Sequence, residues 1–164
     1  VLEAFDREGL IDWLAEQPIV RVHRDCYQVH AGLHPSWTSR ARLEKALAKR
    51  RGKAADDALT FCTRARFCDA KGNLPDRRVV RDADGNPTSA RWLPWYKTYD
   101  PDAHGGRIVV YGHWAMMGLV DRRASIGLDS GCVWGGWMTG YIPEEKRMVS
   151  IRAEASYAGN FRPR

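Results

Sequence analysis

This 164-residue sequence has little of what marks membrane, secreted or zinc-finger proteins. It has no apolar run of the roughly 20 residues that a membrane span requires and no recognisable signal peptide. None of its four cysteines forms a C-x-x-C pair: Cys26, Cys62, Cys68 and Cys132. Cys62 and Cys68 lie six residues apart, which is a poor spacing for zinc. We therefore expect reduced thiols that serve as small core residues, in a cytoplasmic protein without membrane contact.

What the sequence has in excess is positive charge and tryptophan. It carries 26 Lys and Arg against 20 Asp and Glu, a formal net charge of +6, and seven Trp. A mild basic excess favours polyanions such as nucleotides, nucleic acid or phosphate, but it does not choose among them. The length suffices for one domain with a substantial core, and no internal repeat divides it. We treat residues 1–164 as a single domain.

The first half of the sequence alternates helical and strand patterns. Asp6 can cap a helix that carries three apolar residues on one face: Leu10, Ile11 and Leu14. Breakers at Gly32 and Pro35 predict a loop over 31–37. The other expected elements are the end of that helix near Pro18, strands over 19–22 and 27–30, a helix from Thr38, a charged surface cluster over 49–53 and a helix over 54–67.

The second half predicts strands joined by turns. Turn sequences at 71–73 and 84–87 flank an expected exposed strand over 77–81. The apolar run over 107–111 predicts a buried strand. Further expected elements are strands over 124–128, 133–142 and 147–151, a turn at 143–146 and a loose tail from Ala153. Helices first and strands later predict an α/β or α+β layered domain.

Two histidines lie where an apolar strand runs into small residues. His30 precedes Gly32 by two positions, and His113 follows Gly112. Metal-dependent hydrolysis needs imidazole or carboxylate ligands from several strand ends, plus an open position for water. The two histidines therefore suggest a metal site, with a core histidine bonded to backbone as the alternative for each. Asp129, just before a glycine turn, could orient a histidine or hold the turn.

Two arginines, Arg64 and Arg66, fall in the expected helix over 54–67. Residues two apart on a helix do not share one face. One guanidinium could therefore meet a phosphate, which its fork of donors suits, while the other is solvated. Two surface arginines without a ligand are the alternative.

Other polar and aromatic residues have weaker support as site residues. His34 lies in the loop over 31–37 and could approach a substrate. His104 precedes a glycine pair in a turn, so we expect it to be exposed to solvent. The aromatic stretch over 92–96 offers stacking surfaces for a base or for single-stranded nucleic acid, with packing as the alternative.

Four stretches of the chain resemble one known family when they are taken together. They are 29–32 with Pro35 and Trp37, then 62–68, 112–115 and 128–136. In this order they resemble the symmetrical bis(5'-nucleosyl)-tetraphosphatases, the bacterial diadenosine tetraphosphate hydrolases of the calcineurin-like metallophosphoesterase superfamily. The resemblance implies a two-sheet sandwich flanked by helices. It also implies two divalent metals, manganese first with cobalt or magnesium as alternatives, and cleavage of diadenosine tetraphosphate into two ADP.

The resemblance also assigns roles to individual residues. By position, His30 and His113 match the two histidines that bind one of the two metals. Arg64 and Arg66 match a stretch that we place near the substrate phosphates, and Asp129 is left to support a ligand rather than to bind metal directly. The implied mechanism is polarisation of a phosphoryl oxygen by the metal, with a metal-activated hydroxide attacking in line.

The family carries three earlier motifs that do not precede the first matching stretch here: Asp-x-His, Gly-Asp-x-x-x-x-Arg-Gly and Gly-Asn-His-Asp. They supply the second metal, the bridging aspartate and the catalytic histidine, so the catalytic residues of this chain are unknown. We expect the chain to be the C-terminal part of such an enzyme, with the N-terminal part as a partner. Two histidines alone hold a divalent ion weakly, and no two-metal clamp forms without the bridge.

Two further hypotheses remain open. One is a phosphoesterase like the serine/threonine protein phosphatases, since the superfamily includes these. The other is a non-catalytic binder of nucleotides or nucleic acid, built on the basic surface. The stretches Gly112-His113-Trp114 and Cys132-Val133-Trp134-Gly135-Gly136 favour the dinucleotide branch over the protein phosphatases. We do not expect nucleic acid as a partner.

Overall fold

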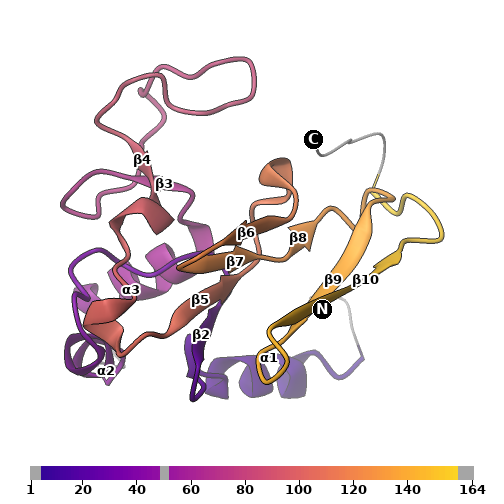
Figure 1. Ribbon diagram of the computed structural model, residues 1–164, viewed down its shortest axis with the longest axis horizontal. Coiled ribbons are helices and arrows are strands. Elements are labelled where there is room, and N and C mark those ends of the chain that lie inside the picture. The colour runs from indigo at the N-terminus through magenta and orange to yellow at the C-terminus, as the bar shows by residue number, and fades with distance from the viewer. Residues whose placement is uncertain (1–4, 49–51, 159–164) are drawn as a thin grey trace.

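The computed structural model describes residues 5–48 and 52–158 and shows a mixed α/β fold (Figure 1), as the sequence predicts. Its helices are α1 (Arg7–Glu16), α2 (Arg40–Leu47) and α3 (Lys53–Arg64), with short 3-10 helices η1 (Trp95–Thr98), η2 (Asp102–His104) and η3 (Ala115–Met117). Its strands are β1 (Val20–Val22), β2 (Cys26–Val29), β3 (Phe67–Cys68), β4 (Leu93–Pro94), β5 (Ile108–Tyr111), β6 (Val120–Arg122), β7 (Ser125–Gly127), β8 (Asp129–Ser130), β9 (Trp137–Ile142) and β10 (Arg147–Arg152).

The central sheet has five strands in the order β1-β2-β5-β7-β6. The three middle strands, β2, β5 and β7, run parallel, and the outer strands β1 and β6 pair antiparallel to them. Strand β5 is mostly buried, as its apolar run predicts. Because parallel strands end at the same edge of a sheet, the segments after β2, β5 and β7 meet there, and binding sites commonly form at that edge.

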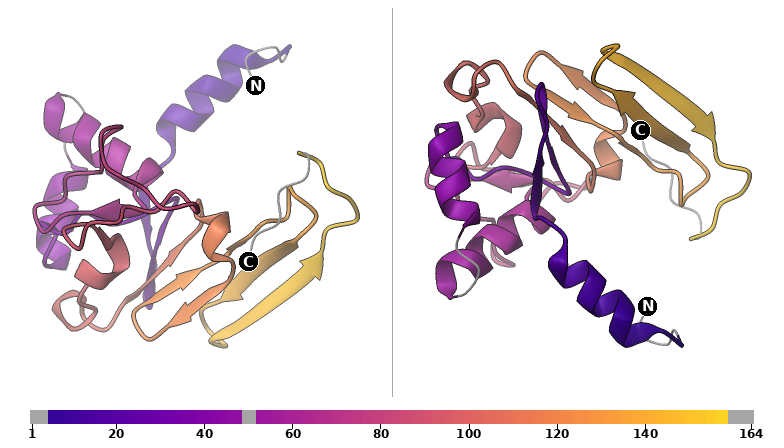
Figure 2. Two further views of the ribbon diagram at one scale, coloured as in Figure 1. Left: turned by 90° about the horizontal axis from the view of Figure 1, so that it is seen from above. Right: turned by 90° about the horizontal axis from the view of Figure 1, so that it is seen from below.

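A second sheet has three strands in the order β10-β9-β8. Strands β9 and β10 form a hairpin whose turn lies at 143–146, as predicted, with Met138 opposite Ile151. The hairpin lies at the opposite end of the molecule from α2 and α3 (Figure 2). The expected strand over 133–142 begins only at Trp137, because turns through Gly131 and Gly135, both with positive φ, occupy the preceding residues.

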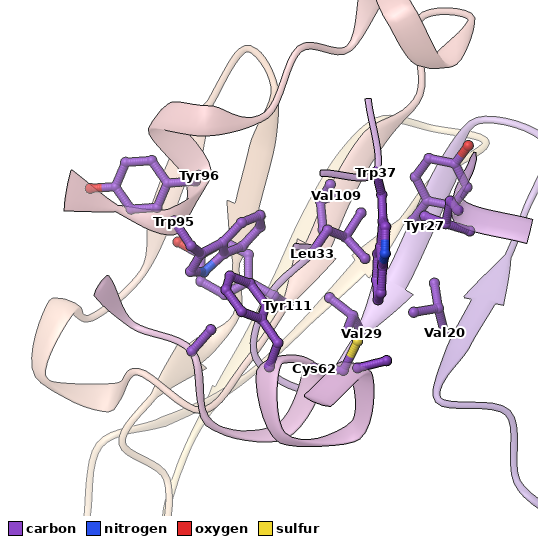
Figure 3. Packing of buried hydrophobic residues seen from close by; sticks show 14 of the residues in the cluster. Val20, Tyr27, Val29, Leu33, Trp37, Cys62, Trp95, Tyr96, Val109 and Tyr111 are labelled. Atoms are coloured by element: carbon purple, nitrogen blue, oxygen red, sulfur yellow. The ribbon is translucent and has the colours of Figure 1, made fainter. Parts of the chain in front are cut away.

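The core is largely aromatic. Trp95, Tyr27 and Phe61 are fully buried, and Trp95 lies edge-on to Tyr111 with ring centroids 5.0 Å apart (Figure 3). Such edge-to-face pairs add stabilisation beyond the burial of their surface.

The cysteines are free thiols, as expected. Cys26, Cys62 and Cys68 are buried, and Cys132 is half-buried. Burial raises the pKa of the Cys62 thiol to about 12, so this thiol is unreactive at neutral pH.

The apolar face of α1 is not buried. No residue of α1 is buried, and Ile11 and Leu14 are exposed. Asp6 occupies the N-cap position, but its side chain accepts no capping hydrogen bond. Figure 2 shows α1 projecting from the central sheet. The spacing of apolar residues in the sequence therefore predicts the helix but not whether its apolar face is covered.

The middle of the chain departs from prediction in two places. Helix α3 ends at Arg64 rather than at Phe67, because the backbone of Ala65 is extended and the following strand β3 pairs with β4. Residues 77–81 form no strand, and only an isolated bridge joins Arg81 to Pro87.

His104 is buried, with 2% of its surface exposed, so its predicted exposure is wrong. Its Nε2 lies 2.8 Å from the carbonyl oxygen of Trp37, and its Nδ1 lies 3.3 Å from the hydroxyl of Tyr27. A carbonyl only accepts hydrogen bonds, so Nε2 is protonated and Nδ1 is free to accept from the hydroxyl. The neutral imidazole is therefore satisfied in the core, and burial lowers its pKa.

We expect His104 to make stability depend on pH. An imidazole with a lowered folded-state pKa contributes stability that is complete above its unfolded pKa of about 6.5 and is lost as the pH falls through the folded value. His104→Gln should lower the free energy of unfolding by about 1–3 kcal/mol at pH 7.5 and flatten the decline between pH 7 and 5. Urea unfolding of both proteins between pH 7.5 and pH 5 measures this. If the free energy of unfolding of the variant fell as steeply with decreasing pH as that of the unaltered chain, the prediction would be contradicted.

Among residues 5–48 and 52–158, no helix is both long and apolar enough to span a bilayer.

Candidate functional site

The structure brings His30 and His113 together at the carboxyl edge of the central sheet. His30 follows β2 and His113 follows β5, and these two strands are parallel neighbours. His30 Nε2 lies 3.3 Å from His113 Nδ1, and the ring centroids are 5.0 Å apart. Residues 83 positions apart in the sequence thus present two ring nitrogens to one point.

The spacing of the two ring nitrogens suits a shared metal ion. Two nitrogens bound at about 2.0–2.1 Å, at angles between a right angle and the tetrahedral value, lie about 2.8–3.4 Å apart. The separation of His30 Nε2 and His113 Nδ1, 3.3 Å, falls in that interval. It also suits a hydrogen bond between one protonated and one unprotonated nitrogen. The pair therefore fits two ligand positions of one ion.

The environment of His113 favours its neutral form. Burial lowers the pKa of His113, and the nearby charges of Arg66 and His30 lower it further. Asp129 and a hydrogen bond between the ring and the backbone of Arg64 act in the opposite direction. A neutral imidazole that bonds a backbone carbonyl while its other nitrogen faces outward is the usual state of a metal-binding histidine.

The backbone at His113 is held in an uncommon conformation. Its φ is +66°, in the left-handed region that non-glycine residues seldom occupy. The amide of Gly112 donates to the carbonyl of His30 at 2.9 Å, and the amide of Ala31 donates to the carbonyl of Cys62 at 2.7 Å. These bonds fix both strand ends, and strained backbone of this kind clusters at functional sites.

Within the described residues, 5–48 and 52–158, no group of three or more His, Cys, Asp or Glu side chains lies close enough to hold a metal. Asp129 is half-buried at the start of β8, and its Oδ1 accepts a long, 3.4 Å hydrogen bond from the amide of Gly131. It therefore helps to hold the turn and also exerts its charge on His113. An Asp-x-His tripeptide does occur at 102–104, but its His104 is bonded within the core.

Arg64 and Arg66 both lie beside the histidine pair, although not on one helix. Arg64 ends α3, and Arg66 lies beyond it with its Nη2 3.3 Å from the carbonyl oxygen of His113. Both side chains are exposed and line one cavity of about 340 Å³. The prediction that they must point in different directions is wrong because the helix ends between them.

This cavity is also lined by a cationic side chain that no sequence pattern singled out. Arg81 reaches it from the loop between β3 and β4. The sequence pattern placed Arg81 at the end of an exposed strand, and nothing in its spacing relates it to Arg64 or Arg66.

The remaining predicted site residues lie elsewhere. His34 bonds the hydroxyl of Ser36 at 2.8 Å and packs edge-on to Phe61, away from the histidine pair. Trp95 and Tyr96 are buried, so the predicted stacking surface is wrong for these two. Trp92 is half-buried, with the guanidinium of Arg91 4.8 Å above its ring.

Comparison with known proteins gives relatives described as symmetrical bis(5'-nucleosyl)-tetraphosphatases. The symmetrical bis(5'-nucleosyl)-tetraphosphatase of Paracidovorax citrulli is 33% identical over 96% of this chain and 68% of that protein. Proteins of the same name from Aromatoleum aromaticum and Burkholderia mallei are 33% and 32% identical over 93% and 82% of this chain. The chain spans 65% and 56% of these two relatives. No family model matches.

Among solved structures, a candidate diadenosine tetraphosphatase is similar over 76% of this chain and 45% of that one, with 23% identity and a TM-score of 0.45. A similarity this low supports no argument about the site. The curated relatives show the family: at 33% identity over 96% of its length and 68% of the relative's, this chain belongs to the symmetrical bis(5'-nucleosyl)-tetraphosphatases.

Proposed function

We propose that this chain carries part of a metal-dependent hydrolase that cleaves diadenosine tetraphosphate symmetrically into two ADP. The observation that carries the proposal is the pair of ring nitrogens 3.3 Å apart at the carboxyl edge of the sheet, in a chain related to tetraphosphatases. His30 and His113 would hold one divalent ion, with manganese as our first choice. The proposal includes a cytoplasmic location, supported by the free thiols.

The residues around the pair suit a polyphosphate substrate. When bound, the ion would polarise a phosphoryl oxygen and lower the pKa of a coordinated water. The guanidinium of Arg66, fixed to the carbonyl of His113, and that of Arg64 would orient phosphate oxygens beside it. The relatives extend beyond the matched region, so the remaining ligands would come from the rest of such a protein.

Incubation of the chain with Mn²⁺ and diadenosine tetraphosphate, followed by chromatographic separation of the products, tests the proposal. ADP is expected as the only product of any turnover, which needs the remaining ligands in addition to His30 and His113. AMP with ATP would contradict symmetrical cleavage. Phosphate release from a phosphopeptide, with the dinucleotide left intact, would favour the protein-phosphatase alternative. Salt-dependent binding of nucleotide or nucleic acid by a chain that binds no Mn²⁺ would favour a non-catalytic binder.

Arg64→Ala is expected to weaken substrate binding more than folding. The side chain is exposed at the end of α3, so its removal leaves no cavity in the core. Loss of one charge-assisted contact should raise KM, or Kd where turnover is absent, about tenfold or more. Arg123→Ala is the control, since Arg123 is also exposed and lies on the turn between β6 and β7, outside this cavity. An unfolded Arg64 variant would mean that this arginine is structural.

A further inference from the structure

The cavity beside the histidine pair is built by four separate parts of the chain. The end of α3 contributes Arg64, Arg66 and Phe67 follow where β3 begins, and Trp114 comes directly after His113. The fourth wall comes from the long loop between β3 and β4, residues 69–92, which we call the arm and which extends outward from that strand pair (Figure 1). The arm brings Arg81 to the cavity.

The arm is clamped at its base. The carboxylate of Asp69 is buried at one end of the arm and lies 2.8 Å from Arg91 Nη2 at the other end. The same carboxylate accepts hydrogen bonds from the backbone amides of Lys71 and Asn73, both at 2.9 Å. Bonds to Asn73 and Arg91 hold the pKa of Asp69 well below its ordinary value, so it is ionised at neutral pH. The two ends of the arm are therefore tied together.

The tip of the arm is also ordered by its own contacts. Arg81 Nη1 donates to the carbonyl of Gly85 at 2.7 Å, and the Asp82 carboxylate accepts from the backbone amides of Asp84 and Asn86. These bonds fix the turn that carries Arg81. A fixed guanidinium loses less conformational entropy when it binds a phosphate than a freely rotating one does.

Arg64, Arg66 and Arg81 line the cavity with side chains that can bind phosphate groups. Arg66 and Arg81 each donate one hydrogen bond to a carbonyl oxygen, of His113 and Gly85, and a guanidinium has five N–H donors in all. The guanidinium fork matches phosphate oxygens bidentately. The cavity, about 340 Å³, lies at the lower end of the range for small-ligand sites and suits half of a dinucleotide rather than the whole. Asp84 also lines the cavity, and its negative charge offsets part of the positive charge of the three arginines.

We propose that this cavity is the subsite for one nucleotide half of the substrate, with Arg81 of the arm as its third phosphate-binding residue. The inference rests on the proposed function for the identity of the substrate, but the cavity does not depend on a metal. Arg66 links the two places, since it lines the cavity and donates to the carbonyl of His113. One half of the substrate would thus lie between the arm and α3 while the scissile phosphate faces the histidines.

The test is calorimetric titration of the chain with ADP in EDTA, so that no metal occupies the histidine pair. Arg81→Gln is expected to raise the Kd at least about tenfold. Arg78→Gln, the matched control, makes the same charge change at an exposed position of the arm that does not line the cavity, and should change the Kd less than about twofold. Equal losses in both variants would mean attraction by net charge and would overturn the subsite. Absence of ADP binding to the unaltered chain at millimolar ADP would also overturn it.

Three more titrations, with pyrophosphate, adenosine and Mn²⁺, separate the ligand classes and the two proposals. ADP should bind more tightly than pyrophosphate, and adenosine most weakly; pyrophosphate binding as tightly as ADP would overturn the assignment to a nucleotide. Mn²⁺ titration without nucleotide tests the histidine pair alone. Mn²⁺ binding together with an Arg81-independent ADP affinity overturns the subsite and leaves the proposed function standing. Arg81-dependent ADP binding without any Mn²⁺ site supports the subsite and contradicts the proposed function.

Discussion

Loss of either imidazole of the histidine pair is expected to abolish binding of Mn²⁺ at this site. His30→Ala and His113→Asn each leave one nitrogen where two now lie 3.3 Å apart. Loss of a residue that merely supports a metal ligand costs about 10–100-fold in affinity, so loss of a ligand should cost at least about 100-fold. Titration of Mn²⁺ followed by electron paramagnetic resonance measures the free ion directly.

Asparagine is the informative replacement at position 113. The backbone there has φ +66°, and asparagine occupies this left-handed region more readily than most residues, so the variant loses the imidazole without added strain. His23→Asn is the control, because His23 is partly exposed and lies against Glu144 rather than at the pair. An unchanged Mn²⁺ affinity in His30→Ala would rule out metal binding by the pair.

The sequence predicts the site better than its surroundings, for a physical reason. An apolar run such as residues 107–111 has to be buried, and a strand that ends in small residues has to leave the sheet there. Parallel pairing of β2 with β5 then brings the two following histidines to one edge. The pairing itself is a long-range contact, so from the residues alone the meeting of His30 and His113 is a hypothesis that the structure confirms.

What the sequence could not predict depends on tertiary contacts. The polarity of His104 indicates exposure, yet the carbonyl of Trp37 and the hydroxyl of Tyr27 satisfy it inside the core. The arm, residues 69–92, has no apolar period, because an ion pair and turn hydrogen bonds order it rather than a buried face. Arg81 therefore carries no sequence signal that relates it to the cavity.

Trp95→Ala is expected to destabilise the fold more than any exposed substitution. The side chain is fully buried, edge-on to Tyr111, and so close to Gly32 that a Cβ added there would lie 2.8 Å from the indole (Figure 3). Truncation of a buried tryptophan typically lowers the free energy of unfolding by about 3–5 kcal/mol. Trp13→Ala is the matched control: Trp13 is 59% exposed on α1, so its loss should stay within about 0.5 kcal/mol. Urea unfolding monitored by circular dichroism compares the two.

The Trp95 variants also test whether the core supports the site. The amide of Trp95 donates to the carbonyl of Arg66 at 3.0 Å, and Gly32, two residues after His30, packs against the indole. Within the described residues the indole Nε1 has no hydrogen-bond partner, so Trp95→Phe removes an unsatisfied donor and keeps much of the ring packing. We expect Trp95→Phe to retain Mn²⁺ binding and Trp95→Ala to weaken it even under conditions where the variant is folded. Equal Mn²⁺ affinity in folded Trp95→Ala would show that the histidine pair is positioned by the strand ends alone, through the bond from Gly112 to His30.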